Sequence, residues 1–218
     1  MSARSFVRLV AAAMVVVSLS PEVTSAQQRT TVRGFGDFGA TRFSAGDTFD
    51  AVLGSSTGTF FGGGVEVVLP QRYFFNLRIS RFNKSGERVF VEDNEVFPLG
   101  IDMKVTITPV EVTGGYRFQP KGQTGKIVPY VGGGIGWYRY SETSDFADTG
   151  EDVSETFQGY HLLGGVEVRL NRWLALGGEG QWTTVPDAFE PVPSSAADLF
   201  GEENLGGLGF RVRFTVGR

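Results

Sequence analysis

Two related stretches of the chain show an alternation of apolar and charged residues. Residues 164–182 read GGVEVRLNRWLALGGEGQW, and residues 63–81 read GGVEVVLPQRYFFNLRISR. In the later stretch Val166 and Val168 flank Glu167, and the pattern resumes after a link of a few residues. A period of two residues indicates β-strands. Because the link is too short for a crossover helix, the two strands of each stretch are predicted to pair antiparallel as a hairpin.

The same alternation predicts eight strands, joined by connections that are long and short in turn. The expected strands are residues 31–42, 58–69, 72–82, 102–118, 127–140, 156–170, 173–183 and 206–217. The long connections are Phe43–Thr57, Asn83–Ile101, Ser141–Glu155 and Thr184–Leu205, and the short ones are Pro70–Gln71, Gln119–Lys126 and Asn171–Arg172. An even strand number with long loops at one end and short turns at the other is typical of an up-and-down β-barrel in a membrane. A soluble β-sandwich, the other architecture open to such a chain, gives no reason for this regularity.

The two faces of the predicted strands differ in a way that favours an apolar exterior around a polar interior. The face assigned outward carries aliphatic and aromatic residues: Tyr73, Phe75, Leu77, Ile79, Tyr116, Phe118, Val166, Val168, Leu170, Leu208, Phe210, Val212, Phe214 and Val216. The face assigned inward carries charged and amide residues: Arg33, Asp37, Glu66, Asn76, Arg78, Glu111, Arg117, Glu167, Arg169, Glu179, Gln181, Arg211 and Arg213.

The inward set holds five acids and six arginines, and this near balance predicts a network of ion pairs. Unpaired charges in a narrow interior would be costly. The solvated face of a sandwich would more usually carry lysine, and no lysine occurs at these positions. Gly64, Gly115, Gly165 and Gly207 share the parity of the charged residues. They are expected to make room for long side chains inside the barrel, since glycine in a strand is otherwise unfavourable.

Two of the predicted strands depart from simple alternation. In strand 102–118 the apolar residues change phase near Pro109, and a β-bulge there is expected to restore the register. In strand 127–140 apolar residues occupy both parities, so its facing stays unassigned.

The first 26 residues are predicted to be a signal peptide rather than part of the fold. Two arginines precede an apolar run of 11 residues, Leu9–Leu19, and cleavage is expected between Ala26 and Gln27. The run is too short to span a membrane as a helix, which takes about 20 residues. The rest of the chain, residues 27–218, is assigned to a single barrel domain.

The amino-acid composition further narrows the class of protein. A formal net charge of −4 speaks against nucleic-acid binding. Glycine makes up 31 of the 218 residues, twice the usual share of about 7%. With no cysteine, the chain can form neither a disulfide nor a lipid-modified cysteine. No stretch after the signal reaches 18 consecutive apolar residues, which excludes transmembrane helices.

On these residues the chain resembles the small eight-stranded outer-membrane barrels of the OmpA and OmpX type, the outer membrane protein β-barrel domain family. The resemblance covers roughly residues 30–218 and rests on GGVEV at 63–67 and 164–168, PYVGGG at 129–134 and FRVRF at 210–214. It implies an all-β fold, a location in the outer membrane of a two-membrane bacterium, and contact with outer-membrane lipid and lipopolysaccharide.

The sequence offers little catalytic or metal-binding chemistry. The single histidine, His161, has inward parity and is interpreted as a hydrogen-bonded interior residue rather than a catalytic base. No cofactor or metal site is predicted, because one histidine and no cysteine leave only carboxylate ligands. Some outer-membrane barrels are lipid-modifying enzymes, but no matching motif is present. The chain is therefore not expected to be an enzyme.

The four long connections are acidic, with formal charges of −2, −2, −6 and −5 in chain order. Such a rim could collect Ca²⁺ or Mg²⁺, bind basic partners, or simply keep the surface soluble. The expected function is a non-enzymatic surface barrel with a structural, adhesive or envelope-integrity role. Passage or binding of small hydrophobic molecules is the alternative, and the charged interior speaks against it.

Overall fold

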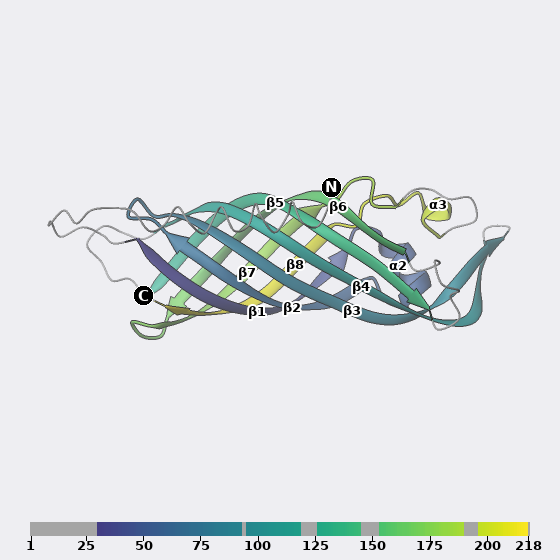
Figure 1. Cartoon of the computed structure of the whole chain (residues 1–218), viewed down its shortest axis with the longest axis horizontal. Helices are drawn as coiled ribbons and strands as arrows, with labels where there is room; N and C mark the ends of the chain where they lie inside the picture. The colour runs from purple at the N-terminus through teal and green to yellow at the C-terminus, as the bar shows by residue number, and fades with distance from the viewer. Residues whose placement is uncertain (1–29, 93–94, 119–125, 145–152, 190–195, 218) are drawn as a thin grey trace, which may run out of the picture.

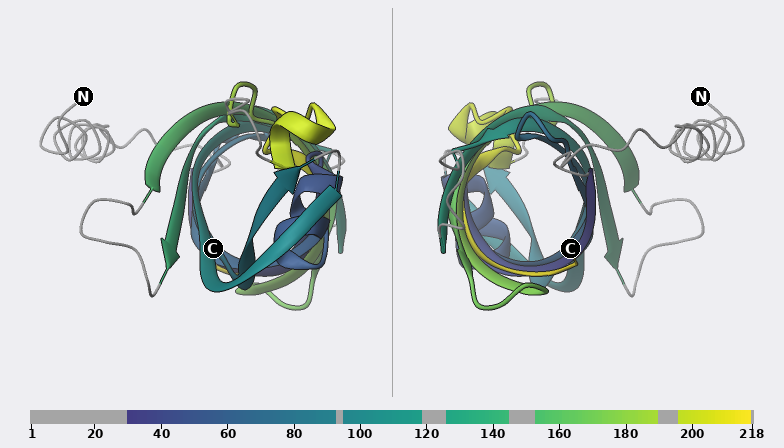
Figure 2. Two further views of the ribbon diagram at one scale, coloured as in Figure 1. Left: turned by 90° about the vertical axis from the view of Figure 1, so that its right-hand side faces the viewer. Right: turned by 90° about the vertical axis from the view of Figure 1, so that its left-hand side faces the viewer.

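The computed structural model describes residues 30–92, 95–118, 126–144, 153–189 and 196–217. Within these ranges the chain forms eight antiparallel strands closed into a barrel, in which each strand pairs with its neighbours in sequence and the last pairs with the first. Figure 1 shows the strands crossing the barrel at a tilt, and Figure 2 shows the closed ring from either end. The prediction of an eight-stranded up-and-down barrel is confirmed.

The elements follow the sequence pattern closely. In chain order they are β1 (Thr31–Phe43), α2 (Gly46–Leu53), β2 (Thr57–Val68), β3 (Tyr73–Glu92), β4 (Glu95–Arg117), β5 (Ile127–Ser144), β6 (Val153–Arg169), β7 (Leu174–Thr184), α3 (Ala196–Phe200) and β8 (Gly207–Gly217). No helix in this described part of the chain is long and apolar enough to cross a membrane. The expected signal peptide, residues 1–26, lies outside the described residues.

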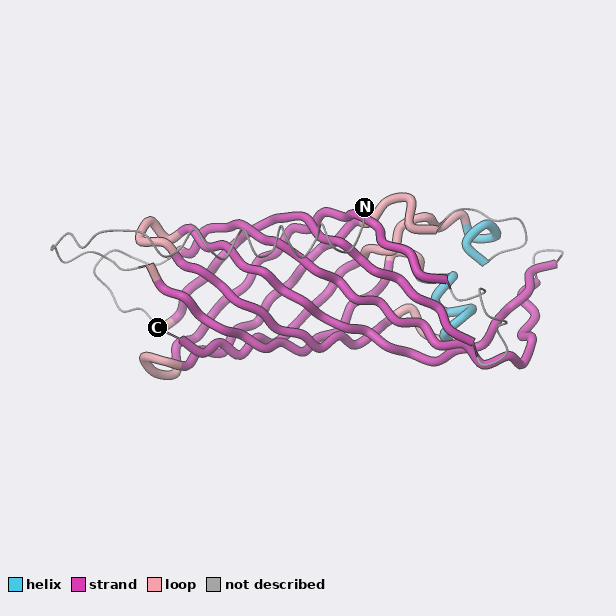
Figure 3. Tube along the Cα trace, viewed as in Figure 1, coloured by secondary structure: helices cyan, strands magenta, loops and turns pink. Residues whose placement is uncertain are grey.

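The connection expected at Asn83–Ile101 is for the most part strand. β3 continues to Glu92 and β4 begins at Glu95, and the two pair along this length as a ribbon, the β3–β4 ribbon, which extends beyond the other strands (Figure 3). The register shifts once, near Gly100, whose φ of +66° lies in the left-handed region that suits glycine. The prediction of a loop was wrong because the residues of the ribbon do not alternate between apolar and polar, so the sequence pattern did not mark them as strand.

The two ends of the barrel differ. One end, called the loop end below, carries α2, α3 and the β3–β4 ribbon (Figure 1). The opposite end, called the turn end, is where β1 starts, β8 ends and tight turns join β2 to β3 and β6 to β7. In the second of these turns the side-chain oxygen of Asn171 accepts hydrogen bonds from the backbone N–H groups of Trp173, at 2.7 Å, and Leu174, at 2.9 Å. Asparagine is favoured in turns for this reason.

Side chains alternate between the interior and the exterior along every strand. The apolar residues assigned outward are exposed, except for Leu77 and Tyr116, which are half-buried. Phe210 and Val212 have 65% and 56% of their surface accessible. The unassigned strand now has a facing as well. On β5, Tyr130 and Tyr138 are buried inside, whereas Ile127 is exposed outside.

β4 runs past Pro109 without a bulge. Its pairing with β5 keeps one register from Met103 to Arg117, and Met103 and Ile107 are buried on the same interior face as Glu111. The expected bulge was therefore wrong. What changes at Pro109 is the chemistry of the barrel interior, from apolar on the loop-end side to charged on the turn-end side.

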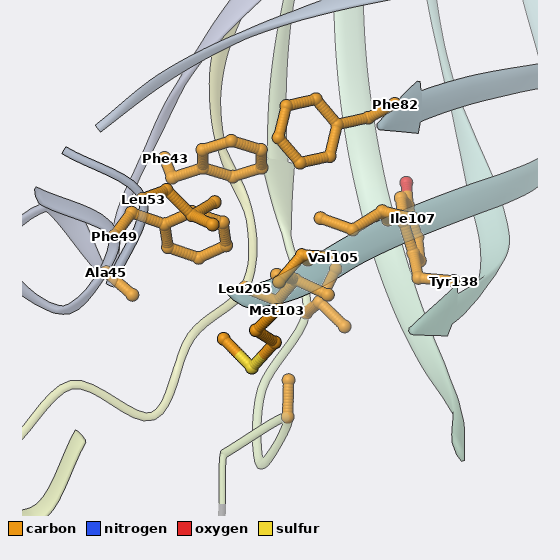
Figure 4. Close-up of a cluster of buried hydrophobic side chains, with 12 residues drawn as sticks. Phe43, Ala45, Phe49, Leu53, Phe82, Met103, Val105, Ile107, Tyr138 and Leu205 are labelled. Carbon is orange, nitrogen blue, oxygen red and sulfur yellow. The ribbon is translucent and has the colours of Figure 1, made fainter. Parts of the chain in front are cut away.

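The loop end of the interior is filled by an apolar cluster, called the apolar cap below (Figure 4). Its buried members are Phe43, Ala45, Phe49, Leu53, Phe82, Met103, Val105, Ile107, Tyr138, Val185, Ala188 and Leu205. The helix α2 supplies Phe49, whose ring stacks on Phe43 of β1 with the centroids 4.1 Å apart. Such stacking adds to the burial of two large apolar side chains.

The helix α2 lacks a capping side chain of its own, since Ala45 occupies the N-cap position. Glu202, in the segment between α3 and β8, takes over this task. Its carboxylate accepts hydrogen bonds from the backbone N–H groups of Asp47, at 3.2 Å, and Thr48, at 2.8 Å. An acceptor at these orphan N–H groups, and a negative charge near the helix N-terminus, both stabilise a helix.

Inward glycines make room for aromatic rings in the barrel. A Cβ atom on Gly115 would lie 2.5 Å from the ring of Phe74, and one on Gly165 would lie 2.6 Å from the ring of Tyr130. The inward facing of these glycines agrees with the sequence pattern. Their neighbours include rings rather than only the long charged side chains expected.

Candidate functional site in the barrel lumen

The charged residues predicted to face inward lie on the interior surface of the barrel. Those that are buried are Arg33, Asp37, Glu66, Arg78, Glu111, Arg117, Glu167, Glu179 and Arg213. The side chains of Arg211 and Arg169 are 13% and 33% exposed. The buried residues form two connected groups, one nearer the turn end and one in the middle of the barrel.

The group nearer the turn end, called the turn-side cluster, is organised around Glu66 of β2 and Glu167 of β6. Arg33 forms ion pairs with both carboxylates, its Nη1 lying 3.0 Å from Oε1 of Glu167. Arg117 also reaches both, with its Nη1 3.3 Å from Oε1 of Glu66. Arg213 places its Nη2 3.0 Å from Oε2 of Glu66. Residues from five strands therefore meet here.

The group in the middle of the barrel, called the central cluster, is organised around Arg78 of β3, which has no exposed surface. Its Nη2 lies 2.8 Å from Oε1 of Glu179 and its Nε lies 3.0 Å from Oδ2 of Asp37. Its Nη1 lies 3.6 Å from Oε2 of Glu111. Arg211 adds a second positive charge, with its Nε 3.5 Å from Oε1 of Glu179.

Arg213 joins the two clusters, because its Nη1 also lies 3.8 Å from Oε2 of Glu179. Together the clusters contain five carboxylates and five arginines, so their formal charges cancel. Arg169 stands at the margin, since its Nε is 4.0 Å from Oε1 of Glu167. Neutrality of this kind is what a poorly hydrated interior requires.

Polar side chains that carry no charge complete the central cluster. The hydroxyl of Tyr130 donates to Oε2 of Glu179 at 3.0 Å, and the hydroxyl of Tyr138 donates to Oε1 of Glu111 at 2.8 Å. Gln181 donates from Nε2 to the same oxygen of Glu111 at 2.7 Å. Sequence reasoning missed the two tyrosines because the facing of β5 was open. Three glycines of β5 have the same parity as these tyrosines. Because glycines on other predicted strands were assigned inward, this shared parity could have indicated that the tyrosines face inward as well.

Phe35 is a third interior residue that sequence reasoning missed. The guanidinium carbon of Arg213 lies 3.6 Å from the centroid of its ring, and that of Arg78 lies 5.5 Å away. The ring face is partly negative, so it attracts both arginines. The signal was available, because Phe35 shares the parity of its neighbours Arg33 and Asp37 on β1.

The single histidine makes a hydrogen bond inside the barrel. Nε2 of His161 lies 2.8 Å from Oγ1 of Thr113, and Nδ1 lies 3.8 Å from Oε1 of Glu111. These three groups are the residue types of a hydrolase triad, although Nδ1 of His161 has no hydrogen-bond partner among the described residues. However, Thr113 has no exposed surface and His161 is only 2% exposed. A substrate carbonyl therefore has no room beside the hydroxyl.

A small cavity of about 50 Å³ lies between the central cluster and the apolar cap. Its lining includes Asp37, Glu111 and Arg211 on the charged side, and Phe43 and Ile107 on the apolar side. The volume suits a few water molecules, which need polar partners of this kind. Thr113 and His161 are not part of the lining. Among the described residues, no group of three or more His, Asp or Glu side chains is placed to hold a metal ion.

Solved structures of other barrels share this architecture. The neisserial surface protein A, NspA, is 14% identical, with a TM-score of 0.50 over 86% of this chain and 95% of that chain. A major outer membrane protein from Thermus thermophilus is 11% identical, with a TM-score of 0.50 over 85% of this chain and 99% of that chain. At these identities the likeness shows the fold alone. No curated protein matches the chain in sequence.

A sequence profile of the outer membrane protein beta-barrel domain matches residues 9–214, which is most of the chain. The matched region contains every strand of the closed barrel except the last residues of β8. The exposed apolar residues of the barrel wall accordingly face lipid, and the buried charged residues face the lumen. The chain belongs to the outer membrane protein beta-barrel domain family and is located in the outer membrane.

Proposed function

We propose that this protein is a closed, non-conducting surface barrel with a structural, adhesive or envelope-integrity role. The observation that carries the proposal is the burial of Arg78 at the centre of the lumen, where carboxylates from β1, β4 and β7 surround it. The interior of an eight-stranded barrel is just wide enough to be filled by its own side chains or to hold one small ligand. Ion pairs that span this interior leave no continuous water path through it.

The lumen has a second closure at the loop end. The apolar cap fills the interior above the central cluster, and α2 covers it with Phe49 and Leu53. An ion entering from outside would have to cross an apolar plug and then a neutral ion-pair layer, which is unfavourable twice over. The barrel is thus a support for what it displays at the loop end.

The displayed surface is acidic, as the charges of the long connections indicate. Such a surface suits basic partners or bridging Ca²⁺ and Mg²⁺ next to lipopolysaccharide phosphates. The described residues contain no ready-made cation site. The most acidic connection, Ser141–Glu155, lies largely outside them, because residues 145–152 are not described.

A second candidate function is the binding or passage of small hydrophobic molecules. The apolar character of the loop-end interior favours it, since such a molecule could replace part of the apolar cap. The central cluster argues against passage through the whole barrel, because an apolar molecule would have to displace buried ion pairs. Catalysis is a weaker alternative still, given the burial of Thr113 and His161.

Conductance of the purified protein in planar bilayers tests the proposed function. We expect no stable, long-lived current steps from the parent protein. Arg78→Ala is the matched variant, because it opens the central cluster without touching the apolar cap. Stable conductance by the parent would overturn the closed-barrel proposal. Uptake of a hydrophobic fluorophore into liposomes containing the parent, above the rate of protein-free liposomes, would favour the second candidate instead.

A further inference from the structure

The charges of the lumen balance over the whole network but not within each cluster. The central cluster has two arginines against three carboxylates, which leaves a formal charge of −1. The turn-side cluster has three arginines, with Arg213 counted here, against Glu66 and Glu167, which leaves +1. An excess of positive charge therefore lies toward the turn end, the end that faces the viewer in the right-hand view of Figure 2.

Two further cations, Lys126 and Arg169, are directly opposite each other at the turn end. The backbone N–H of Arg169 donates to the carbonyl oxygen of Lys126 at 2.7 Å, at the position that continues the register of β5 with β6. Both residues have inward parity, because Val128 and Glu167, two positions further into their strands, are buried inside the barrel. Opposite residues of an antiparallel pair have Cβ atoms about 5 Å apart. The two side chains thus begin side by side on the lumen face of the wall.

The acids of the turn end do not balance these two cations. Within the described residues, the ammonium group of Lys126 forms no ion pair. Nε of Arg169 lies 4.0 Å from Oε1 of Glu167, an oxygen that Arg33 and Arg117 approach more closely. The two cations raise the formal charge at this end of the lumen from +1 to +3. The connecting segments at this end, residues 68–73, 118–126 and 170–173, contain no acidic residue in their sequence.

This excess of positive charge calls for an anion from solution. Like charges at opposite positions of a strand pair destabilise the pair, and unbalanced charge in a narrow interior is costly. Lys126 is exposed and the side chain of Arg169 is 33% exposed, so a solute can reach both from the turn end. The short turns of outer-membrane barrels lie on the periplasmic side. A periplasmic anion can therefore supply the missing negative charge.

We propose that Lys126 and Arg169 bind a phosphate-sized oxyanion from the periplasm at the mouth of the lumen. A guanidinium can donate two parallel hydrogen bonds to such an anion, and an ammonium group on a long side chain adds further donors. Lipid phosphates surround the outside of the wall, whereas both side chains have inward parity. The site lies on the turn-end side of the two clusters, so it is independent of whether the lumen conducts.

The test is binding of radiolabelled inorganic phosphate to the full mature chain in phosphatidylcholine nanodiscs, measured by equilibrium dialysis in chloride buffer at constant ionic strength. The double variant Lys126→Gln/Arg169→Gln is expected to bind phosphate about tenfold more weakly than the parent or worse, because charge-assisted hydrogen bonds are lost. Its urea unfolding in chloride alone should stay close to that of the parent, since Lys126 has no ion pair to lose and the ion pair of Arg169 is long.

Arg72 and Arg172 provide a matched control. They lie in the turns that join β2 to β3 and β6 to β7, at the same end of the barrel. The guanidinium of Arg172 lies 5.8 Å from the ring centroid of Trp173, a residue that is 46% exposed. Arg72→Gln/Arg172→Gln removes the same number of positive charges from the turn end but leaves Lys126 and Arg169 in place. We expect this variant to bind phosphate like the parent.

Four outcomes would overturn the proposal. The first is the absence of measurable binding to the parent at millimolar phosphate. The second is equal phosphate affinity of the parent and the Lys126→Gln/Arg169→Gln variant. The third is an equal loss of affinity in the two double variants, which would indicate diffuse attraction by a basic surface rather than a site. The fourth is competition by phosphatidylglycerol built into the nanodisc, which would place the anion on the lipid side of the wall.

Discussion

The membrane part of the barrel and its loop end are built on the same alternation with opposite chemistry. In the membrane part, Glu66, Arg78 and Glu179 face inward while Val212 and Phe210 face lipid. At the loop end the inward positions are apolar and form the apolar cap, and the outward positions are polar. The strands pass from one region to the other without changing parity, as β4 does at Pro109. Outward residues are apolar where the wall faces lipid and polar where it faces water, and the inward residues show the opposite chemistry.

Truncation of a single interior side chain is expected to lower the unfolding free energy most at Arg78. Arg78→Ala leaves three buried carboxylates short of a partner, so we expect a loss of about 3–5 kcal/mol in unfolding free energy. The measurement is urea unfolding in lipid bilayers. Arg169→Ala is the control, because that side chain is 33% exposed and its ion pair should contribute less than about 1 kcal/mol. Equal effects of the two variants would mean that water screens the whole lumen.

The exterior offers the next test of the comparison. Val212 is the middle one of the five outward apolar residues of β8, and Val212→Arg should cost about 2–4 kcal/mol in bilayers, because the arginine faces hydrocarbon. Thr106→Arg places the same side chain on the outward face of β4 near the loop end. We expect it to be nearly neutral, since that face meets water. A large loss for Thr106→Arg would place the membrane border closer to the β3–β4 ribbon than we infer.

The smallest expected effect distinguishes a side chain that is packed in the interior from one that contacts lipid. Ile107 of the apolar cap is 1% exposed and Ile135 on the outer wall is 36% exposed. Ile107→Val should destabilise the barrel by about 0.5–1.5 kcal/mol, since it removes a methylene group from a packed core. Ile135→Val should change stability much less, because lipid chains fill the lost space. If thermal unfolding in bilayers gives the same shift for both variants, the apolar cap is not packed as a core.

The fold could be predicted from the sequence because a period of two is a local property. Each strand of the barrel shows its two faces in its own residues, as Val166, Glu167 and Val168 do. The β3–β4 ribbon was missed because its residues do not alternate between apolar and polar. The same limit explains Pro109, where an exchange of apolar and polar faces was taken for a shift of register.

The partners within the lumen could not be predicted in the same way. The inward parity of Arg78 and Glu179 follows from their strands, but their 2.8 Å contact joins β3 to β7 across the barrel. Which residues meet there depends on strand tilt and stagger, which are properties of the closed barrel rather than of any segment. The tyrosines of β5 show the second limit. Apolar residues on both parities hide the facing of a strand, so Tyr130 and Tyr138 were not assigned.

The contact of Glu202 with the N-terminus of α2 has a consequence for the order of folding. It joins residues 154 positions apart in sequence, and these residues belong to the segments that follow β1 and precede β8. A contact between residues so far apart in sequence closes a long loop, which is entropically costly to do early in folding. Interactions made after the transition state slow unfolding while leaving the folding rate nearly unchanged. We therefore expect the contact of Glu202 with α2 to slow the opening of the seam between β1 and β8 rather than to speed its formation.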